Sequence, residues 1–307
     1  MVVRTVGTLS QATYRHSDDG HKEVVVKFLI SALLAMTFLA PPASAATVRQ
    51  ITGFGSNPGA LQMYEYIPDG LASGRPVVVA LHGCTQDATY GQNAGWIELA
   101  DRLRFTVVLP QQVTTNNFSK CFNWFQPLDI RRGSGEAESI AQMARRGIAD
   151  ASGDPRRVYV TGLSAGGAMT SVMLAAYPDM FAGGGVVAGL PYGCAATVIE
   201  AYTCMNPGKD LTPRQWGDKV RDASTFSGAR ASVTVWHGTA DYTVASANMR
   251  ELSEQWTDVG APVQTRSITG MGHGQPVAPA QGCGRAGAYM LDVGVCAAAE
   301  LSRTWGL

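Results

Sequence analysis

The sequence predicts an α/β fold in which a mostly parallel central sheet is covered by helices on both faces. Two observations lead to this prediction. Short, nearly continuous apolar runs, such as 76–81 and 105–109, are typical of strands buried on both faces. Stretches with helical spacing lie between these runs, and strands that alternate with helices usually form a parallel sheet.

The first 45 residues are expected to precede the folded domain. Lys27 is followed by the apolar stretch 28–40 and then by small residues around Ala45, which is typical of a secretory signal peptide. The stretch is too short to span a bilayer, so we expect cleavage after Ala45 and no stable membrane insertion. The secreted product is then a single domain at 46–307. Because so long a polar segment rarely precedes a signal peptide, we expect the true translation start at Val24, Val25 or Val26.

The first half of the domain is expected to open with two antiparallel strands. Gly, Ser, Asn and Pro at 55–59 are turn residues between them. A buried strand then ends at His82, and the alternation of helix and strand begins. The elements expected in this half are strands at 47–54, 61–67, 76–81 and 105–109 and helices at 96–103 and 136–148.

The second half continues the alternation. A β-branched and aromatic run at 158–160 predicts a buried strand, and small residues at 165–176 suit a helix directly after it. The sequence contains no repeat, low-complexity tract or linker that would divide the domain. The other elements expected are strands at 185–188, 233–236 and 263–269 and a helix at 248–258.

Ser164 is the candidate nucleophile. It is the central residue of Gly162-Leu163-Ser164-Ala165-Gly166, between a predicted strand and a predicted helix, as in a nucleophile elbow. Glycines are required there because neighbouring side chains would collide with the backbone of the strained turn. The pattern also arises by chance in glycine-rich chains, but the flanking strand and helix favour the elbow. A phosphate site is disfavoured because no Lys-Ser or Lys-Thr follows the glycines.

Asp241 and His273 are the candidate acid and base. A serine hydroxyl needs a base, which in turn needs an orienting acid, and in α/β-hydrolases both follow the nucleophile in that order. Each of these residues follows a predicted strand, so we expect them to meet Ser164 at one edge of the sheet. We interpret His237, which precedes the acid, as structural. Two carboxylates remain alternative acids: Asp258 and Asp292.

An oxyanion hole requires two backbone N–H groups. We assign one to Ala165, the residue after the nucleophile, and the other to Cys84, in the loop after the strand at 76–81. His82 is then expected to shape this loop. A bond from Cys84 to Cys121 would bring Asn123 and Trp124 towards the site as a pocket wall, although core packing explains such aromatic residues equally well.

Six cysteines lie in the predicted domain, and an even number in an exported chain indicates disulfides. The sequence leaves the pairing open, and we predict the sequence-local set. A metal site is disfavoured because no Cys-x-x-Cys occurs, and the zero net charge gives no reason to expect nucleic-acid binding. The predicted pairs are Cys84–Cys121, Cys194–Cys204 and Cys283–Cys296.

These residues resemble the polyhydroxybutyrate depolymerase family of secreted esterases, which is related to feruloyl and acetylxylan esterases. The resemblance implies an α/β-hydrolase fold, ester hydrolysis through an acyl-enzyme, and no cofactor. It also places the family's triad on Ser164, Asp241 and His273 and its oxyanion donor on Cys84. The matching stretches are 81–86, 121–125, 131–136, 162–167, 236–244, 270–273 and 305–307.

The expected substrate is a small or polymeric ester of the polyhydroxyalkanoate (3-hydroxybutyrate) type. Two departures from the family pattern keep feruloyl and acetylxylan esters open: the chain ends with its catalytic domain, and Gly274-Gln275-Pro276 follow the histidine where depolymerases often have a Trp. Two other functions fit the sequence less well. A serine peptidase would need donors for a peptide terminus, and an inactive binding protein would show a damaged triad; neither feature is visible.

Overall fold

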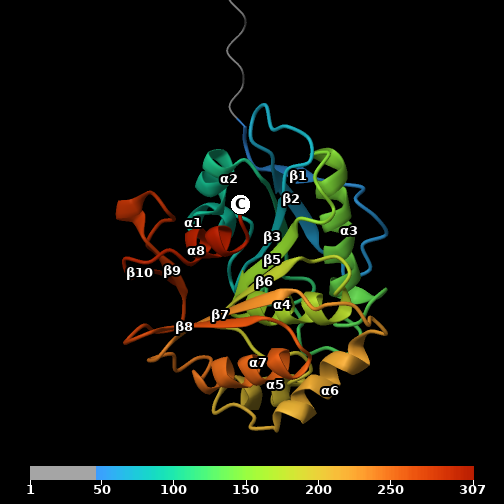
Figure 1. Ribbon diagram of the computed structural model, residues 1–307, viewed down its shortest axis with the longest axis vertical. Coiled ribbons are helices and arrows are strands. Elements are labelled where there is room, and N and C mark those ends of the chain that lie inside the picture. Colours follow the sequence, from blue (N-terminus) through green and yellow to red (C-terminus); the bar gives the residue numbers. More distant parts are fainter. Residues whose placement is uncertain (1–45) are drawn as a thin grey trace, which may run out of the picture. The chain divides into compact units, whose positions relative to one another are not determined.

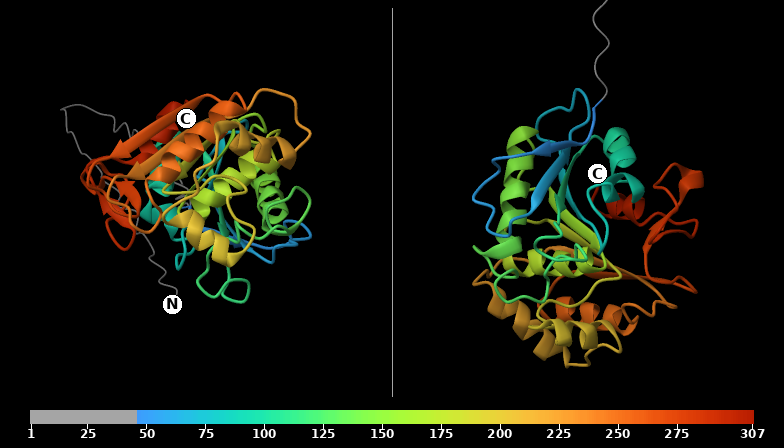
Figure 2. Two further views of the ribbon diagram at one scale, coloured as in Figure 1. Left: turned by 90° about the horizontal axis from the view of Figure 1, so that it is seen from below. Right: turned by 180° about the vertical axis from the view of Figure 1, so that it is seen from behind.

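The computed structural model describes residues 46–307, so the predicted signal peptide, its cleavage site and the alternative start lie outside the described residues. Helices lie on both faces of a central sheet (Figures 1 and 2). The predicted α/β fold is therefore confirmed.

Eight strands form the sheet, in the order β1-β2-β4-β3-β5-β6-β7-β8. β2 runs antiparallel to both of its neighbours, whereas every pair from β4 to β8 is parallel. This is the antiparallel opening and parallel continuation that the sequence predicts. The strands are β1 Arg49–Ile51, β2 Gln62–Tyr66, β3 Val77–Leu81, β4 Thr106–Gln111, β5 Val158–Leu163, β6 Gly183–Val187, β7 Ser232–Gly238 and β8 Val263–Ile268.

Two hydrophobic cores lie against the two faces of the sheet. One contains side chains from α3, α4, α5, α6 and α7, and the other contains side chains from α1, α2 and α8. The helices are α1 Tyr90–Asn93, α2 Trp96–Leu103, α3 Gly135–Asp150, α4 Ala165–Ala176, α5 Val198–Met205, α6 Pro213–Ala223, α7 Ala247–Asp258 and α8 Ala297–Thr304.

β3 shows why the central strands are continuous apolar runs. Val77, Val79 and Leu81 contribute to one core, and the alternate residues Val78 and Ala80 contribute to the other. Successive side chains of a strand point to opposite faces, so a strand covered on both sides can be apolar at every position. β8 differs because it lies at the sheet edge, and its residues 264–267 are exposed.

The structure adds elements that the sequence analysis did not predict. α1 and the small parallel sheet of β9 Gln275–Val277 and β10 Met290–Asp292 are too short to show a periodic pattern. α5 and α8 are also new. α6 carried a readable signal, since Thr212 and Gln215 form a capping box around Pro213 at the helix start.

Candidate active site

Ser164 occupies the turn between β5 and α4. Its backbone has φ 58° and ψ −118°, a strained conformation for a residue with a side chain. A Cβ at Gly162 would collide with the carbonyl of Gly166, and a Cβ at Gly166 would collide with the carbonyl of Leu81. Only glycine fits these two positions, and the turn holds the Ser164 hydroxyl at the carboxyl edge of the sheet.

The loops after β7 and β8 carry Asp241 and His273. These strands are parallel neighbours, so both loops begin at the same edge of the sheet as the Ser164 turn. The N–H of Ala240 donates to the carbonyl of Met271 at 3.0 Å, which joins the two loops directly. Asp241 and His273, 32 residues apart in sequence, thus lie on two loops that are hydrogen-bonded to each other.

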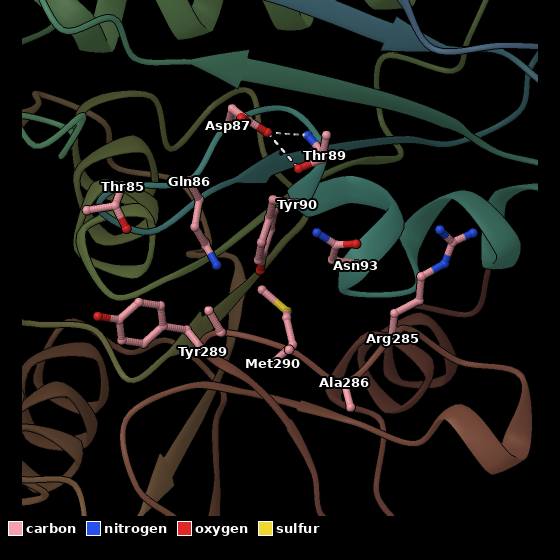
Figure 3. A pocket seen from close by; sticks show the side chains of 12 residues that line it. Thr85, Gln86, Asp87, Thr89, Tyr90, Asn93, Arg285, Ala286, Tyr289 and Met290 are labelled. Atoms are coloured by element: carbon pink, nitrogen blue, oxygen red, sulfur yellow. Dashed lines mark hydrogen bonds between the residues drawn. The ribbon is translucent and has the colours of Figure 1, made fainter.

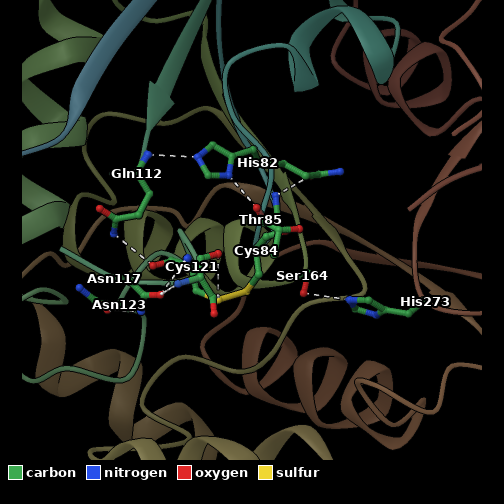
Figure 4. The surroundings of a disulfide bond; sticks show 12 residues. His82, Cys84, Thr85, Gln112, Asn117, Cys121, Asn123, Ser164 and His273 are labelled. Carbon is green, nitrogen blue, oxygen red and sulfur yellow. Dashed lines mark hydrogen bonds between the residues drawn. A yellow bond between two sulfur atoms is a disulfide. The ribbon is translucent and has the colours of Figure 1, made fainter. Parts of the chain in front are cut away.

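The three side chains form a continuous hydrogen-bonded chain. His273 Nδ1 lies 2.7 Å from Asp241 Oδ2, and His273 Nε2 lies 2.9 Å from Ser164 Oγ. A carboxylate can only accept, so Nδ1 carries the proton and the lone pair of Nε2 faces the serine hydroxyl. Figure 4 shows the contact between His273 and Ser164. This is the geometry of a general base beside a nucleophile.

Asp241 is held as a carboxylate. Burial would raise its pKa, but side-chain hydrogen bonds from His237 and His273, together with the N–H of Val244, outweigh burial and hold the pKa of Asp241 well below its usual range. Asp241 Oδ1 accepts the N–H groups of Thr243 and Val244, each at 2.9 Å. The acid is therefore charged at neutral pH and fixed in orientation.

His237 is a buried neighbour of Asp241. Its Nε2–H donates to the carbonyl of Val244 at 2.9 Å and lies 3.5 Å from Asp241 Oδ2, and the ring is 1% exposed. The ring braces the loop that presents the carboxylate. The two alternative acids lie elsewhere: Asp258 pairs with Arg221 at 2.7 Å, and Asp292 is an exposed residue of β10.

The loop that carries Cys84 packs against the Ser164 turn. A Cβ at Gly83 would come within 3.4 Å of the Leu163 carbonyl oxygen, so the two backbones are in close contact. No hydrogen bond within residues 46–307 uses the N–H of Cys84. Cys84 is bonded to Cys121, and Figure 4 shows this disulfide together with Ser164 and His273. The loop can therefore offer a free N–H beside the serine.

The His82 side chain holds the loop that carries Cys84 in place. Its Nε2 accepts the backbone N–H of Gln112 at 3.0 Å, which leaves the proton on Nδ1, and Nδ1–H donates to the Gly83 carbonyl at 2.7 Å. Burial lowers the pKa of His82 to about 4, so the ring is neutral. His82 makes no bond to Ser164 in the described residues.

Glu136, at the start of α3, was not singled out by the sequence analysis. It is fully buried, and its carboxyl group accepts from Gln112 Nε2 and from both the backbone and side-chain nitrogens of Asn123. Burial raises the pKa of Glu136 to about 8. An acidic residue in a first helical turn usually marks a solvated helix end, so the sequence held no signal for this role.

Asn123 and Trp124 follow Cys121, which forms a disulfide with Cys84. The amide of Asn123 is engaged by Glu136 and Asn117, and Trp124 is buried in the core. Their role as a pocket wall stays a prediction. The other cysteines are bonded as Cys194–Cys204 and Cys283–Cys296.

Residues 46–307 contain no group of His, Cys, Asp or Glu arranged to hold a metal ion. None of their helices combines the length and the apolarity needed to cross a bilayer. The three disulfides are typical of a protein that folds in an oxidising compartment.

Comparison with known proteins identifies the family of this chain. Residues 61–273 match the family model described as esterase PHB depolymerase. Poly(3-hydroxyalkanoate) depolymerase C of Paucimonas lemoignei is 47% identical over 294 residues, which cover 86% of this chain and 71% of that protein. Feruloyl esterase B of Thermothelomyces thermophilus is 34% identical over 252 residues, which cover 79% of this chain and 85% of that protein.

The fold agrees as well. The solved structure of acetyl xylan esterase from Aspergillus awamori superposes with a TM-score of 0.69 at 30% identity, covering 74% of this chain and 94% of that chain. This similarity and the mostly parallel sheet confirm the α/β-hydrolase fold. Because the family model spans more than half of the chain, the protein belongs to the esterase PHB depolymerase family and is a carboxylic-ester hydrolase.

Proposed function

We propose that the protein is a secreted serine esterase in which Ser164 is the nucleophile, His273 the general base and Asp241 the orienting acid. One observation carries the proposal: the unbroken chain of contacts from Asp241 Oδ2 through both ring nitrogens of His273 to Ser164 Oγ, at 2.7 and 2.9 Å. The elbow supports it, because its strain is expected where a nucleophile must be presented.

The reaction follows from these positions. Ser164 Oγ attacks the ester carbonyl carbon while His273 Nε2 takes its proton, and the N–H groups of Cys84 and Ala165 stabilise the oxyanion. The carbon–oxygen bond to the alcohol then breaks, and His273 returns the proton to the leaving oxygen. Water, activated by His273, attacks the acyl-enzyme and releases the acid.

The proposed substrates are 3-hydroxybutyrate-type polyesters and their oligomers. The relative with 47% identity is named as a poly(3-hydroxyalkanoate) depolymerase, which favours this class. Aryl and acetyl esters of plant polysaccharide are the second candidate, because the feruloyl and acetylxylan esterases also match over most of the domain. The proposal includes secretion as a single catalytic domain after cleavage behind Ala45, and the three disulfides support the secretion.

The first experiment replaces Ser164 by Ala and follows hydrolysis of p-nitrophenyl butyrate. Loss of the nucleophile is expected to lower kcat by roughly 10⁶-fold, the scale known for serine hydrolases. A fluorophosphonate should label the parent enzyme at Ser164, detected by peptide mass, and should not label the variant. Hydrolysis of 3-hydroxybutyrate oligomers, methyl ferulate and acetylated xylan, compared side by side, ranks the substrate classes.

Ser171→Ala is the matched control. Ser171 lies in the same helix, is fully buried, and its hydroxyl has no hydrogen-bond partner among the described residues. This variant should keep the parent activity and the fluorophosphonate label. Substantial activity of Ser164→Ala, or labelling at another serine, would refute the assignment of the nucleophile.

A further inference from the structure

A pocket of about 290 Å³ lies between the loop at 85–93 and the C-terminal segment at 285–290 (Figure 3). The sequence analysis did not anticipate it, because the two segments are about two-thirds of the chain apart. Thr85 and Tyr289 lie at one end, and Asn93 and Arg285 lie towards the other. The pocket is therefore elongated, and its two ends differ in chemistry.

The first end adjoins the reacting groups. Thr85 follows Cys84, the proposed oxyanion donor, and the ring of Tyr289 packs edge-on against the ring of His273 with centroids 6.2 Å apart. His273 must return a proton to the leaving oxygen, so the leaving alcohol has to lie on its side of Ser164. The pocket is thus placed to hold the alcohol part of the ester.

Both polar and apolar side chains line the pocket. Tyr90 and Met290 are buried side chains that lie between the two ends. Their apolar surface can contact a short aliphatic chain that carries methyl groups.

The far end carries Arg285, an exposed residue with no acidic partner among residues 46–307. The Arg285 side chain makes no ion pair or hydrogen bond with any residue of 46–307, while its backbone N–H donates to the Asn93 carbonyl at 2.9 Å. The pocket's other charged residue is Asp87, which accepts from Thr89 and lies 3.9 Å from Lys120. An unpaired guanidinium presents a planar set of donors that matches a carboxylate.

We propose that this pocket binds the leaving-alcohol end of a hydroxy-acid oligomer and that Arg285 pairs with the free carboxylate at that end. The inference rests on the proposed esterase function and narrows its substrate class to soluble oligomers with a free carboxyl terminus. Cleavage of the ester next to that terminus leaves the acyl part on Ser164. The released hydroxy acid takes its proton from His273 and departs with its carboxylate.

The experiment compares 3-hydroxybutyrate trimer as the free acid with the same trimer as its methyl ester. For Arg285→Gln, KM for the free acid is expected to rise roughly tenfold or more, because a charge-assisted hydrogen bond is lost. KM for the methyl ester and turnover of p-nitrophenyl butyrate should not change. Arg285→Lys, which keeps the charge, should recover part of the loss. Arg303→Gln, at an exposed position of α8 outside the pocket, is the control.

The outcomes separate the inference from the proposed function. An equal effect of Arg285→Gln on acid and methyl ester, or no effect on either, would overturn the role of Arg285 while the esterase proposal stands. If the parent enzyme hydrolyses p-nitrophenyl butyrate but neither trimer, the proposed substrate class fails and the inference fails with it. A selective loss for the free acid, with Arg303→Gln unchanged, supports the inference.

Discussion

Ser164 lies between two groups of proposed partners, and the two groups differ in how they are built. On one side, two side chains, Asp241 and His273, perform the proposed chemistry themselves through two short hydrogen bonds. On the other side, the proposed work falls to a backbone N–H of Cys84, and its position depends on many residues that touch no substrate. A disulfide, a buried neutral histidine and a buried carboxyl group hold that loop.

This difference determines how each side can fail. A side-chain function is lost when one atom is replaced, even if the fold is untouched. A backbone function survives replacement of its own side chain and is lost only when the supports move. Activity on the first side should therefore respond to single atoms, whereas the second side should couple activity to local stability.

Among the residues that serve Ser164, the largest effect is expected for Asp241→Asn. An amide in place of the carboxylate can turn its NH₂ group towards His273 Nδ1, which then favours the tautomer whose Nε2 carries the proton and cannot act as a base. We expect kcat to fall by about 10⁴-fold with little change in KM. Steady-state hydrolysis of p-nitrophenyl butyrate measures this fall.

Asp258→Asn is the matched control for that prediction. Asp258 also lies after β7, but it is the last residue of α7 and pairs with Arg221. Parent-like activity is expected. If Asp258→Asn were the more damaging change, the acid would have been assigned to the wrong carboxylate.

How far the two sides could be predicted from sequence differs in the same way. The Ser164 turn and the order of Asp241 and His273 are visible because each function belongs to a residue type after a buried strand. The supports of Cys84 are not visible. In the sequence, Glu136 is typical of an acidic residue at a helix start, and nothing indicates that Gln112 and Asn123 surround it.

The fold shows a parallel contrast. The central strands were predictable because burial on both faces leaves a continuous apolar run, as in Val77–Leu81. β9 and β10 were not, since three residues cannot show a period, and their pairing depends on tertiary contacts. One side of the pocket that contains Arg285 is formed by this C-terminal part of the chain, and sequence patterns therefore gave no indication of the pocket.

A smaller effect on kcat, combined with a loss of stability, is expected when the Cys84–Cys121 bond is removed by replacing both residues with Ala. The bond closes a segment with a sequence separation of 37, and its loss should lower the free energy of unfolding by about 4 kcal/mol. Displacement of one oxyanion donor should lower kcat by about 10²-fold. Urea unfolding and steady-state kinetics of the same preparation measure both quantities.

The Cys194–Cys204 bond provides the comparison. It has a sequence separation of 10, so its removal should cost about 3 kcal/mol of stability. It does not close the segment that carries Cys84 and should leave kcat near the parent value. Equal losses of kcat for the two double variants would mean that general destabilisation, and not the position of the Cys84 N–H, controls activity.

The smallest effect is a pH-dependent one at His82. Burial lowers the pKa of His82 from 6.5 to about 4, so between these values the unfolded chain binds a proton that the folded chain does not. The free energy of unfolding should therefore decrease as the pH falls from 6.5 to 4, by about 3 kcal/mol from this residue.

His82→Gln keeps an acceptor for the Gln112 N–H and a donor for the Gly83 carbonyl, but it cannot titrate. Urea unfolding at several pH values gives the free energy of unfolding of the parent and of His82→Gln as a function of pH. The two free-energy curves should run parallel above pH 7 and converge in acid. If the difference in free energy of unfolding between the two proteins stayed constant from pH 7 to 4, protonation of His82 would not affect the stability of the Cys84 loop.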